Sequence, residues 1–301
     1  MRKVFVGLTL AFLSSIAWIV WSVIADILLM GGKKDYVAYL TLIYVIVLLF
    51  ATVIAVFYIK KSGNGFKGKE LRLVPYALSA GVIFAVGTII FFSLLGNTSY
   101  PFVAAVQVSA VVPYAFFITL ITKERPKANY YIGTLIVLSG FVLQVFGLYG
   151  DDFSAAASTI LLSVSVLVLY TIGYILSFYF VYNGLHPLKA SPVVIFTSMV
   201  TVLAYGLITN AYVHAGQITG YGVLLSVFIA IAVVVGYTFE ELPVKMLKLS
   251  GVKYLNLANL LSSFETPGIL VFSAVFLSLL YPPLIIGLLL TFAGIVLVVY
   301  S

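Results

Sequence analysis

Four acidic residues stand inside long apolar stretches of this 301-residue sequence: Asp26, Glu240, Glu241 and Glu265. A charged carboxylate at the centre of a membrane-spanning helix costs about 2.5 to 3.5 kcal/mol, so such a group is normally paired, hydrated or protonated. No lysine or arginine is expected at the depth of Glu265, which is near the centre of its stretch. Glu265 is therefore interpreted as a substrate-binding or proton-coupling group, with a protonated, hydrogen-bonded structural acid as the alternative.

The neighbouring acids Glu240 and Glu241 allow two interpretations. Lys245 follows Glu241 by four residues, the spacing of a helical ion pair, which favours a pair near the membrane surface. The internal repeat described below instead maps both acids onto the middle of a helix, where at least one would face a cavity. Both remain candidates for proton coupling.

Deep polar residues supply candidate substrate contacts. On an ideal helix Asn256, Asn259, Ser263 and Thr266 share one side, whereas Glu265 projects nearly opposite. Either this polar stripe or the acid is expected to line a path through the protein.

Aromatic residues at mid-depth are a second source of contacts. Trp and Tyr normally gather at the membrane interfaces, so those inside the apolar stretches either pack in the core or form a stacking wall for a substrate. The candidate substrate-binding residues are Trp18, Trp21, Gln107, Tyr170, Tyr174, Asn259 and Ser263.

Two prolines interrupt helical stretches. Pro113 and Pro267 have no N–H group, so the carbonyl groups of Ser109 and Ser263 lose their helical partners. Within hydrocarbon these carbonyls need another donor. One interpretation is a kink repaired by the serine hydroxyl, and the other is a gating bend that presents a carbonyl to a cavity.

The composition indicates which elements must position these residues. The chain is 63% hydrophobic and 8% charged, which is typical of membrane proteins. An apolar run of about 20 residues can cross about 30 Å of hydrocarbon as a helix. The sequence predicts an all-α integral membrane protein with ten transmembrane helices, near 5–30, 36–59, 74–96, 100–122, 128–148, 156–182, 190–212, 221–248, 253–278 and 281–300. The first run is too long for a cleaved signal peptide and is expected to be retained.

Several chemistries find no support. The chain has no cysteine, and both histidines, His186 and His214, fall in predicted loops. No catalytic triad, metal cluster or phosphate loop is readable, and Ser263 has no partnered histidine. We therefore expect no enzymatic activity, no cofactor and no metal.

The net charge of +7 is distributed by loop rather than spread as a nucleic-acid-binding surface. When alternate loops are assigned to opposite sides, only Lys33 and Lys34 lie opposite the N-terminal side, where they are expected to pair with Asp26. The other 14 of the 16 basic residues share one side: Arg2, Lys3, Lys60, Lys61, Lys67, Lys69, Arg72, Lys123, Arg125, Lys127, Lys189, Lys245, Lys248 and Lys253. The positive-inside rule predicts that both termini are cytoplasmic.

An internal repeat appears when the chain is shifted by 154 residues without a gap. The coinciding pairs are Tyr100 and Tyr254, Ala104 and Ala258, Ser109 and Ser263, Pro113 and Pro267, Gly133 and Gly287, and Gly140 and Gly294. We expect two five-helix repeats, 1–147 and 155–301, joined by an external loop at 148–154. An odd number of helices inverts the second repeat, as in many secondary transporters.

Paired glycines recur at a spacing of seven, Gly133 with Gly140 and Gly287 with Gly294. Seven steps of about 100° place each pair on one helix face. Small residues let membrane helices approach closely, so we expect a packing seam, with motion or dimerisation as the alternative.

Longer segments resemble a known family. The run AAVQVSAVVPYAFFITLITKERPKANYYIGTLIVLSGFVLQVFG resembles the fourth and fifth helices of EamA-type drug/metabolite transporters, including the pair Glu124 and Arg125. NLANLLSSFETPGILVFSAVF followed by PPLIIGLLLTFAGIVLVV resembles the same block in the second half, and SSIAWIVWSVIA resembles the first helix. Two positions depart from the pattern, Ile19 and Ser278. The resemblance implies a cavity lined by helices one to four and six to nine, with the fifth and tenth helices packed behind it.

The residue types restrict the cargo. A deep site without a fixed cation suits phosphates poorly, because phosphates call for Arg or Lys. We expect a secondary transporter of a small neutral, zwitterionic or cationic metabolite, exporting amino acids or similar compounds by alternating access with or without proton coupling. The alternatives are a neutral sugar or purine uptake carrier and a membrane channel. We place it in the plasma membrane of a prokaryote, as a monomer or weak homodimer whose partners are substrate, lipid and protons rather than nucleic acid.

Overall fold

Helix is the regular structure of this chain throughout the part that the computed structural model describes. In hydrocarbon no water is available to pair with backbone N–H and C=O groups, and a helix satisfies them internally. The described residues are 2–30, 36–63, 65–95, 100–122, 125–150, 152–212, 218–248, 252–262, 264–265, 267–268 and 282–299.

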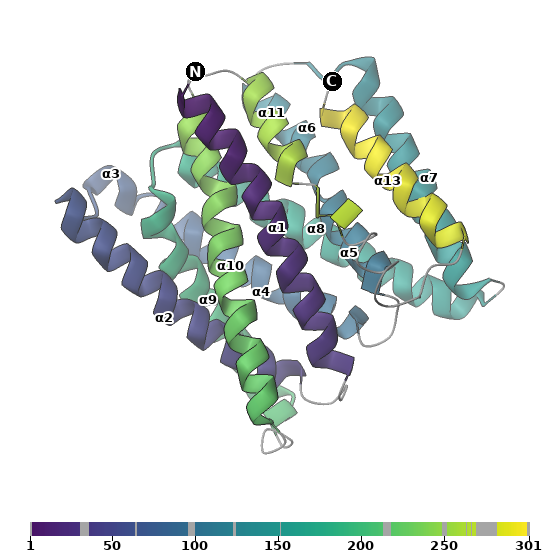
Figure 1. Ribbon diagram of the computed structural model, residues 1–301, viewed down its shortest axis with the longest axis horizontal. Coiled ribbons are helices and arrows are strands. Elements are labelled where there is room, and N and C mark those ends of the chain that lie inside the picture. Colours follow the sequence, from purple (N-terminus) through teal and green to yellow (C-terminus); the bar gives the residue numbers. More distant parts are fainter. Residues whose placement is uncertain are drawn as a thin grey trace.

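The helices form one elongated bundle (Figure 1). In chain order they are α1 (Arg2–Met30), α2 (Tyr36–Ser62), α3 (Gly68–Leu71), α4 (Val74–Leu95), α5 (Tyr100–Ser109), α6 (Val111–Thr122), α7 (Ala128–Tyr149), α8 (Phe153–Tyr182), α9 (Pro187–Ile208), α10 (Gly220–Leu247), α11 (Val252–Ser262) and α13 (Pro282–Val299).

Among the described residues, eight helices are long and apolar enough to cross a membrane. Their outward faces carry large apolar side chains, for example Phe57 and Leu135, which are 71% and 65% exposed. Such a surface is expected where lipid, not water, surrounds the protein. By length and composition this is a multi-pass membrane protein, and the eight helices match eight of the ten predicted spans.

The predicted fourth span, 100–122, is not continuous. Helix α5 ends at Ser109 and α6 begins at Val111, and the N–H of Ala110 between them donates to the carbonyl of Gln107 over 3.1 Å. Pro113 explains the break, because it cannot donate to the carbonyl four residues earlier. The hydroxyl of Ser109 donates to the carbonyl of Ala105 over 2.7 Å. The predicted repair by this hydroxyl was wrong, since it serves a different carbonyl.

The predicted ninth span, 253–278, is described only in part. Helix α11 covers Val252–Ser262, and beyond it the structure describes Phe264, Glu265, Pro267 and Gly268. The N–H of Gly268 donates to the carbonyl of Phe264 over 3.2 Å, a separation of four residues as in a helical hydrogen bond. The rest of the predicted span lies outside the described residues.

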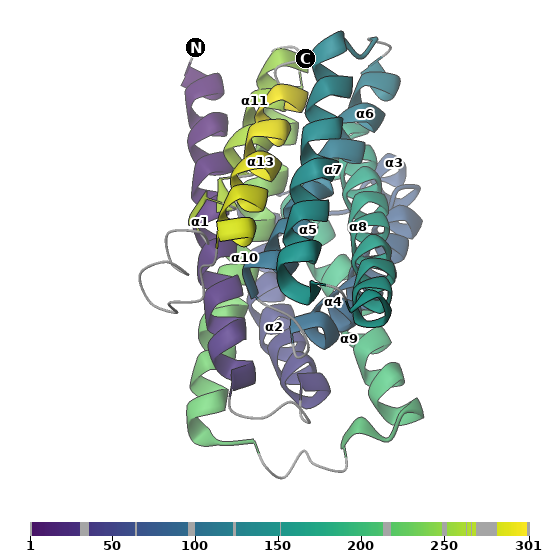
Figure 2. The same cartoon turned by 90° about the vertical axis from the view of Figure 1, so that its right-hand side faces the viewer.

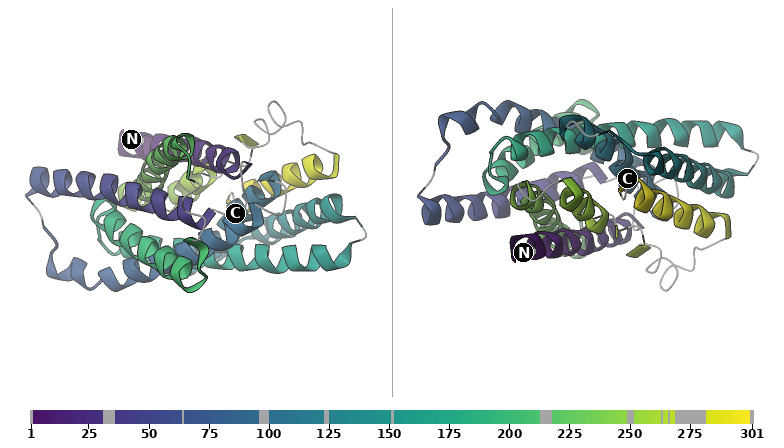
Figure 3. Two further views of the ribbon diagram at one scale, coloured as in Figure 1. Left: turned by 90° about the horizontal axis from the view of Figure 1, so that it is seen from below. Right: turned by 90° about the horizontal axis from the view of Figure 1, so that it is seen from above.

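The helices pair in a regular way, and both termini lie at one end of the bundle (Figures 1 and 2). Helix α1 packs along α10, and α4 packs between α8 and α9. Helix α2 packs on α9 and also contacts α10, while α7 and α13 form a pair at one side, visible from both ends in Figure 3.

The α7–α13 pair is a glycine seam. A Cβ atom on Gly133 would lie 2.6 Å from the carbonyl oxygen of Gly294, and one on Gly140 would lie 2.5 Å from that of Gly287. No real side chain tolerates such distances, so the two backbones touch. The prediction that the paired glycines serve close packing is confirmed, with each pair packed against the other.

Polar contacts tie several helix ends together. The buried ammonium group of Lys189, at the start of α9, lies 2.8 Å from Glu70 Oε2 in α3 and donates to the carbonyl of Gly65 over 2.9 Å. His186 caps α9 by accepting from the N–H of Leu188, and its ring stacks on Tyr58 with centroids 4.1 Å apart. The connection between α2 and α4 is thereby fixed to the start of α9.

Candidate functional site

A cavity lies between α1, α2, α4, α5, α8, α9 and α10, with about 90 Å³ available to the centres of water-sized molecules. It is bounded by apolar residues of α2, α9 and α10 and by polar and aromatic side chains. Six of the sequence-predicted residues meet in its wall: Trp18, Trp21, Gln107, Tyr170, Tyr174 and Glu240. These residues come from four helices, and none of the four is adjacent in sequence to another.

A second, smaller cavity of about 30 Å³ adjoins the first. The two cavities share four residues in their walls, Trp18, Gln107, Tyr174 and Glu240. The smaller one is also lined by Val108, Val111, Tyr114, Ser262 and Glu265. The break between α5 and α6 therefore borders the same space as the acid of the predicted ninth helix.

Trp18 and Glu240 form a contact across the α1–α10 pair. The indole Nε1 of Trp18 donates to Glu240 Oε2 over 3.1 Å. Gly236, one turn before Glu240, makes room for the indole, because a Cβ there would lie 2.9 Å from Trp18 Cε2. Glu240 thus occupies the cavity position that the repeat register suggested, rather than a position at the surface.

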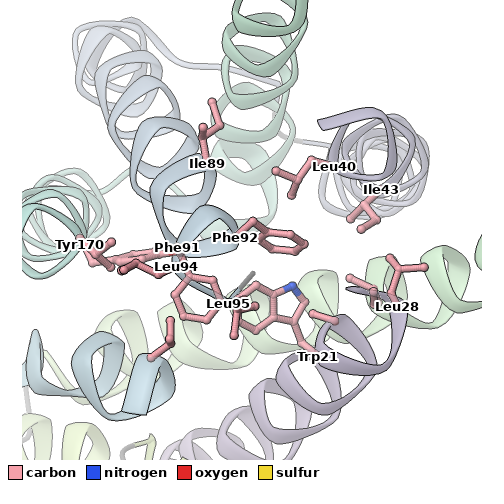
Figure 4. Close-up of a cluster of buried hydrophobic side chains, with 14 of the residues drawn as sticks. Trp21, Leu28, Leu40, Ile43, Ile89, Phe91, Phe92, Leu94, Leu95 and Tyr170 are labelled. Carbon is pink, nitrogen blue, oxygen red and sulfur yellow. The ribbon is translucent and has the colours of Figure 1, made fainter. Parts of the chain in front are cut away.

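Trp21 and Tyr170 belong to an aromatic wall (Figure 4). The Trp21 ring lies 5.2 Å from the Phe91 ring and at right angles to Trp18, with centroids 5.8 Å apart. Tyr170 stacks on Tyr174 with centroids 6.2 Å apart. The rings therefore pack against one another and also bound the cavity, which combines the two interpretations made from the sequence.

Hydroxyl groups cluster on another part of the wall. Thr88 Oγ1 lies 3.1 Å from Tyr170 Oη, and Tyr44 Oη donates to Thr88 over 3.4 Å. Thr88 also donates to the carbonyl of Phe84 in its own helix over 2.8 Å. These hydroxyl groups already hydrogen-bond to one another and to the backbone. They therefore form a polar surface with little hydrogen-bonding capacity left for a ligand.

Glu265 is held by α1. Ser22, which is fully buried, donates to Glu265 Oε1 over 2.9 Å, and the Glu265 side chain is 3% exposed. Nearby, Ile19 occupies the space that a side chain at position 268 would need, since a Cβ on Gly268 would lie 2.2 Å from Ile19 Cδ1. Glu265 thus has a hydroxyl partner and borders the smaller cavity, whose wall, as far as the structure describes it, contains no lysine, arginine or histidine.

Glu241 faces elsewhere. Its side chain is 5% exposed, it lines neither of these two cavities, and it forms no ion pair with Lys245. The predicted Glu241–Lys245 pair was wrong, because Glu241 points into the packed interior while the Lys245 side chain is exposed. Its Oε2 atom has no hydrogen-bond partner among the described residues.

Some candidates fall outside the described residues. They include the whole of Ser263 and Thr266, the side chains of Asn256 and Asn259, and the partners Lys33 and Lys34 expected for Asp26. His214 is also outside. Whether the polar stripe of the predicted ninth helix lines a path therefore stays a prediction, whereas Glu265, on the opposite side, borders a cavity.

Sequence reasoning missed Ser22, the hydrogen-bond donor to Glu265, and four members of the main cavity's wall: Tyr44, Thr88, Ser198 and Tyr237. A weak signal was available for Ser22, because it follows Trp18 by four residues and so shares its helix face. The others carry no signal of their own in a chain with 21 tyrosines. The described residues contain no group of three side chains suited to a metal ion.

Comparison with known proteins relates this chain to others by fold. No family model matches the sequence, and no curated protein matches it. Among the solved structures that match, one titled only "Crystal structure of protein" has a TM-score of 0.63 at 14% sequence identity, over 95% of both chains. At this identity the likeness concerns the fold alone, so the resemblance to EamA-type transporters stays an expectation.

Proposed function

We propose that this protein is a secondary active transporter that carries a small neutral, zwitterionic or cationic metabolite by alternating access. The observation that carries the proposal is the internal cavity, whose wall combines aromatic rings, hydroxyl and amide groups and the carboxylate of Glu240. A membrane-embedded site of this size with few polar groups suits a small organic solute.

Helix pairing supports an inverted repeat in the proposed transporter. If the first five predicted spans exchange with the last five, the α1–α10 pair exchanges with α4–α8, and α2–α10 with α4–α9. The pairs α2–α9 and α7–α13 exchange with themselves. This reciprocity is expected of two halves related by a two-fold axis in the membrane plane, and rocking of the halves would expose the cavity to each side in turn.

Proton coupling at Glu265 is part of the proposal. A charged carboxylate in the membrane interior is costly unless a cation or water accompanies it, whereas the protonated form is not. Such a carboxyl group can therefore take up and release a proton during transport, as a coupling site must. Glu265 has Ser22 as hydrogen-bond donor, and the smaller cavity that it borders also holds Glu240, Tyr114 and Tyr174. Protonation of Glu265 would thus change the charge beside residues that line both cavities.

The proposed direction and location follow the charge pattern and the EamA resemblance. Both termini would be cytoplasmic, in the plasma membrane of a prokaryote, and the carrier would export amino acids or related compounds. Uptake of neutral sugars or purines would use the same cavity, so the substrate screen should include both classes.

Counterflow in proteoliposomes tests the proposal. Purified protein would first be screened by thermal shift against amino acids, amines, sugars and purines, because a ligand of the folded state raises the midpoint of unfolding. Proteoliposomes loaded with a stabilising compound should then accumulate trace labelled compound from outside. A channel gives no accumulation under these conditions, and that result would overturn the carrier mechanism.

A further inference from the structure

Two polar atoms in the wall of the main cavity lack a partner. Gln107 is 4% exposed, yet its amide oxygen Oε1 has no hydrogen-bond partner among the described residues. The hydroxyl of Tyr237 is buried and unpartnered in the same way. Buried polar groups are normally satisfied, so these two atoms indicate a position where a ligand supplies the missing contacts.

Both unpartnered atoms share the cavity with Glu240. An amide oxygen and a carboxylate accept hydrogen bonds, and a tyrosine hydroxyl can also accept one. The Glu240 carboxylate uses one oxygen for the N–H of Trp18 and keeps further acceptor capacity. The cavity therefore offers acceptors from two helices, Gln107 on α5 and both Tyr237 and Glu240 on α10, which calls for a ligand group rich in N–H donors.

The charge of the wall also favours a cation. Among the described residues, Glu240 is the one acidic residue of the wall, and no lysine, arginine or histidine lines the cavity. A carboxylate on the ligand would find no cationic partner there. Aromatic rings of Trp18, Trp21 and Tyr174 bound the same space, and such faces attract organic cations.

Size and polarity limit the rest of the ligand. One water needs at least about 10 to 15 Å³, so a cavity of about 90 Å³ has room for a small organic molecule. Leu40, Ile43, Val47, Val194 and Ile195 form an apolar part of the wall. A small hydrocarbon body would pack there.

We propose that the main cavity binds a small primary amine as its ammonium ion, with the N–H groups directed to Glu240, Gln107 and Tyr237 and an apolar body against α2 and α9. This names the substrate class of the cavity in the proposed transporter and rests on that function only for calling the ligand a substrate. It separates two acids by role, since Glu240 holds the amine and Glu265 is left for the proton.

Isothermal titration of the purified full-length protein in detergent tests the proposal with four matched probes. These are n-butylammonium, tetramethylammonium, n-butanol and butyrate. We expect n-butylammonium to bind more tightly than tetramethylammonium, which has no N–H donor, and the neutral and anionic probes to bind more weakly than either. Equal binding of n-butanol, or preference for butyrate, would overturn the proposal.

Variants locate the binding. Glu240→Gln should weaken n-butylammonium binding by at least about thirtyfold, as expected when one partner of a buried charge pair is neutralised. Tyr237→Phe and Gln107→Leu should each weaken it by about two- to tenfold. Glu241→Gln is the matched control, because it makes the same change one residue away and outside both cavities, and it should bind like the parent.

A folding control accompanies these titrations. Glu240→Asp keeps the charge and should retain part of the affinity that Glu240→Gln loses, provided that both elute as single species and unfold cooperatively. Unchanged affinity in a folded Glu240→Gln protein would refute the assignment.

The two proposals fail in different ways. Glu240-dependent amine binding without counterflow of the amine would leave the binding site standing and remove the carrier function. Counterflow of a neutral or zwitterionic compound, with no amine binding, would leave the carrier function standing and remove the amine-binding site.

Discussion

The indole Nε1 of Trp18 donates a hydrogen bond to Glu240 Oε2 over 3.1 Å. The two residues are 222 positions apart in the chain, and their contact joins α1 to α10. Both residues line both cavities. A ligand that engages Glu240 therefore also changes the surroundings of Trp18, and through it the contact between α1 and α10. This link connects occupancy of the cavity to the relative position of two helices that belong to different predicted repeats.

Tryptophan fluorescence should report that link directly. The chain has two tryptophans, and both line the main cavity. Ligand binding should change the emission, and the change should persist in Trp21→Phe but largely disappear in Trp18→Phe, because Trp18 contacts Glu240. Emission titrations of the parent and the two variants provide the measurement. A response that follows Trp21 instead would show that the ligand lies away from Glu240.

Replacement of Glu265 should uncouple transport from the proton gradient. Glu265→Gln keeps the shape and the acceptor for Ser22 but cannot exchange a proton, so transport should become indifferent to an imposed pH gradient. Proteoliposome assays with acidic and alkaline exteriors measure this, with Glu241→Gln as a control that should keep the parent's pH dependence. Unchanged pH dependence in Glu265→Gln would remove the coupling role.

The glycine seam should be intolerant of even one methyl group. In Gly140→Ala the new Cβ would lie 2.5 Å from the carbonyl oxygen of Gly287, so α7 and α13 must move apart. Overpacking of this kind costs about 1 to 3 kcal/mol. The midpoint of thermal unfolding should fall, whereas Gly220→Ala, which meets nothing within 4 Å, should leave it nearly unchanged. Equal midpoints for the two variants would contradict the close backbone contact.

His186 should make stability depend on pH. Burial, reinforced by the positive charges of Lys245 and Lys189, lowers the pKa of His186 from 6.5 to about 4. The unfolded chain therefore binds this proton first, and stability is lost as pH falls from about 6.5 toward about 4. His186→Asn removes the titration while its side-chain oxygen can still cap the N–H of Leu188.

Unfolding midpoints recorded across this pH interval should fall less steeply for His186→Asn than for the parent. The same slope in both proteins would mean that other groups cause the acid sensitivity. A variant elsewhere at the helix ends, Lys69→Gln, serves as a control for loss of one ionisable group.

The sequence predicted the membrane helices well, because hydrocarbon leaves a spanning segment little choice but helix. It also singled out Trp18, Trp21, Gln107, Tyr170 and Tyr174, which the structure places in the wall of the main cavity, since deep polar and aromatic residues are unusual enough to be found by inspection. Their role in substrate binding stays a prediction. The break in the helix at Ala110 could not be predicted from the sequence. Pro113 predicted a kink, but whether a helix bends or ends depends on how neighbouring helices support it.

Glu240 and Glu241 show what the sequence determines and what only the tertiary structure decides. By itself the sequence determined that two adjacent acids stand within an apolar helix, and it left open whether they lie near the membrane surface or at a cavity. Adjacent residues on a helix point about 100° apart. The rotation of α10 about its own axis therefore decides which acid contacts Trp18 and which points into the packed interior. Only the packing of α10 against α1 fixes that rotation, because it is set by side chains such as Trp18 against Gly236 that are distant in sequence.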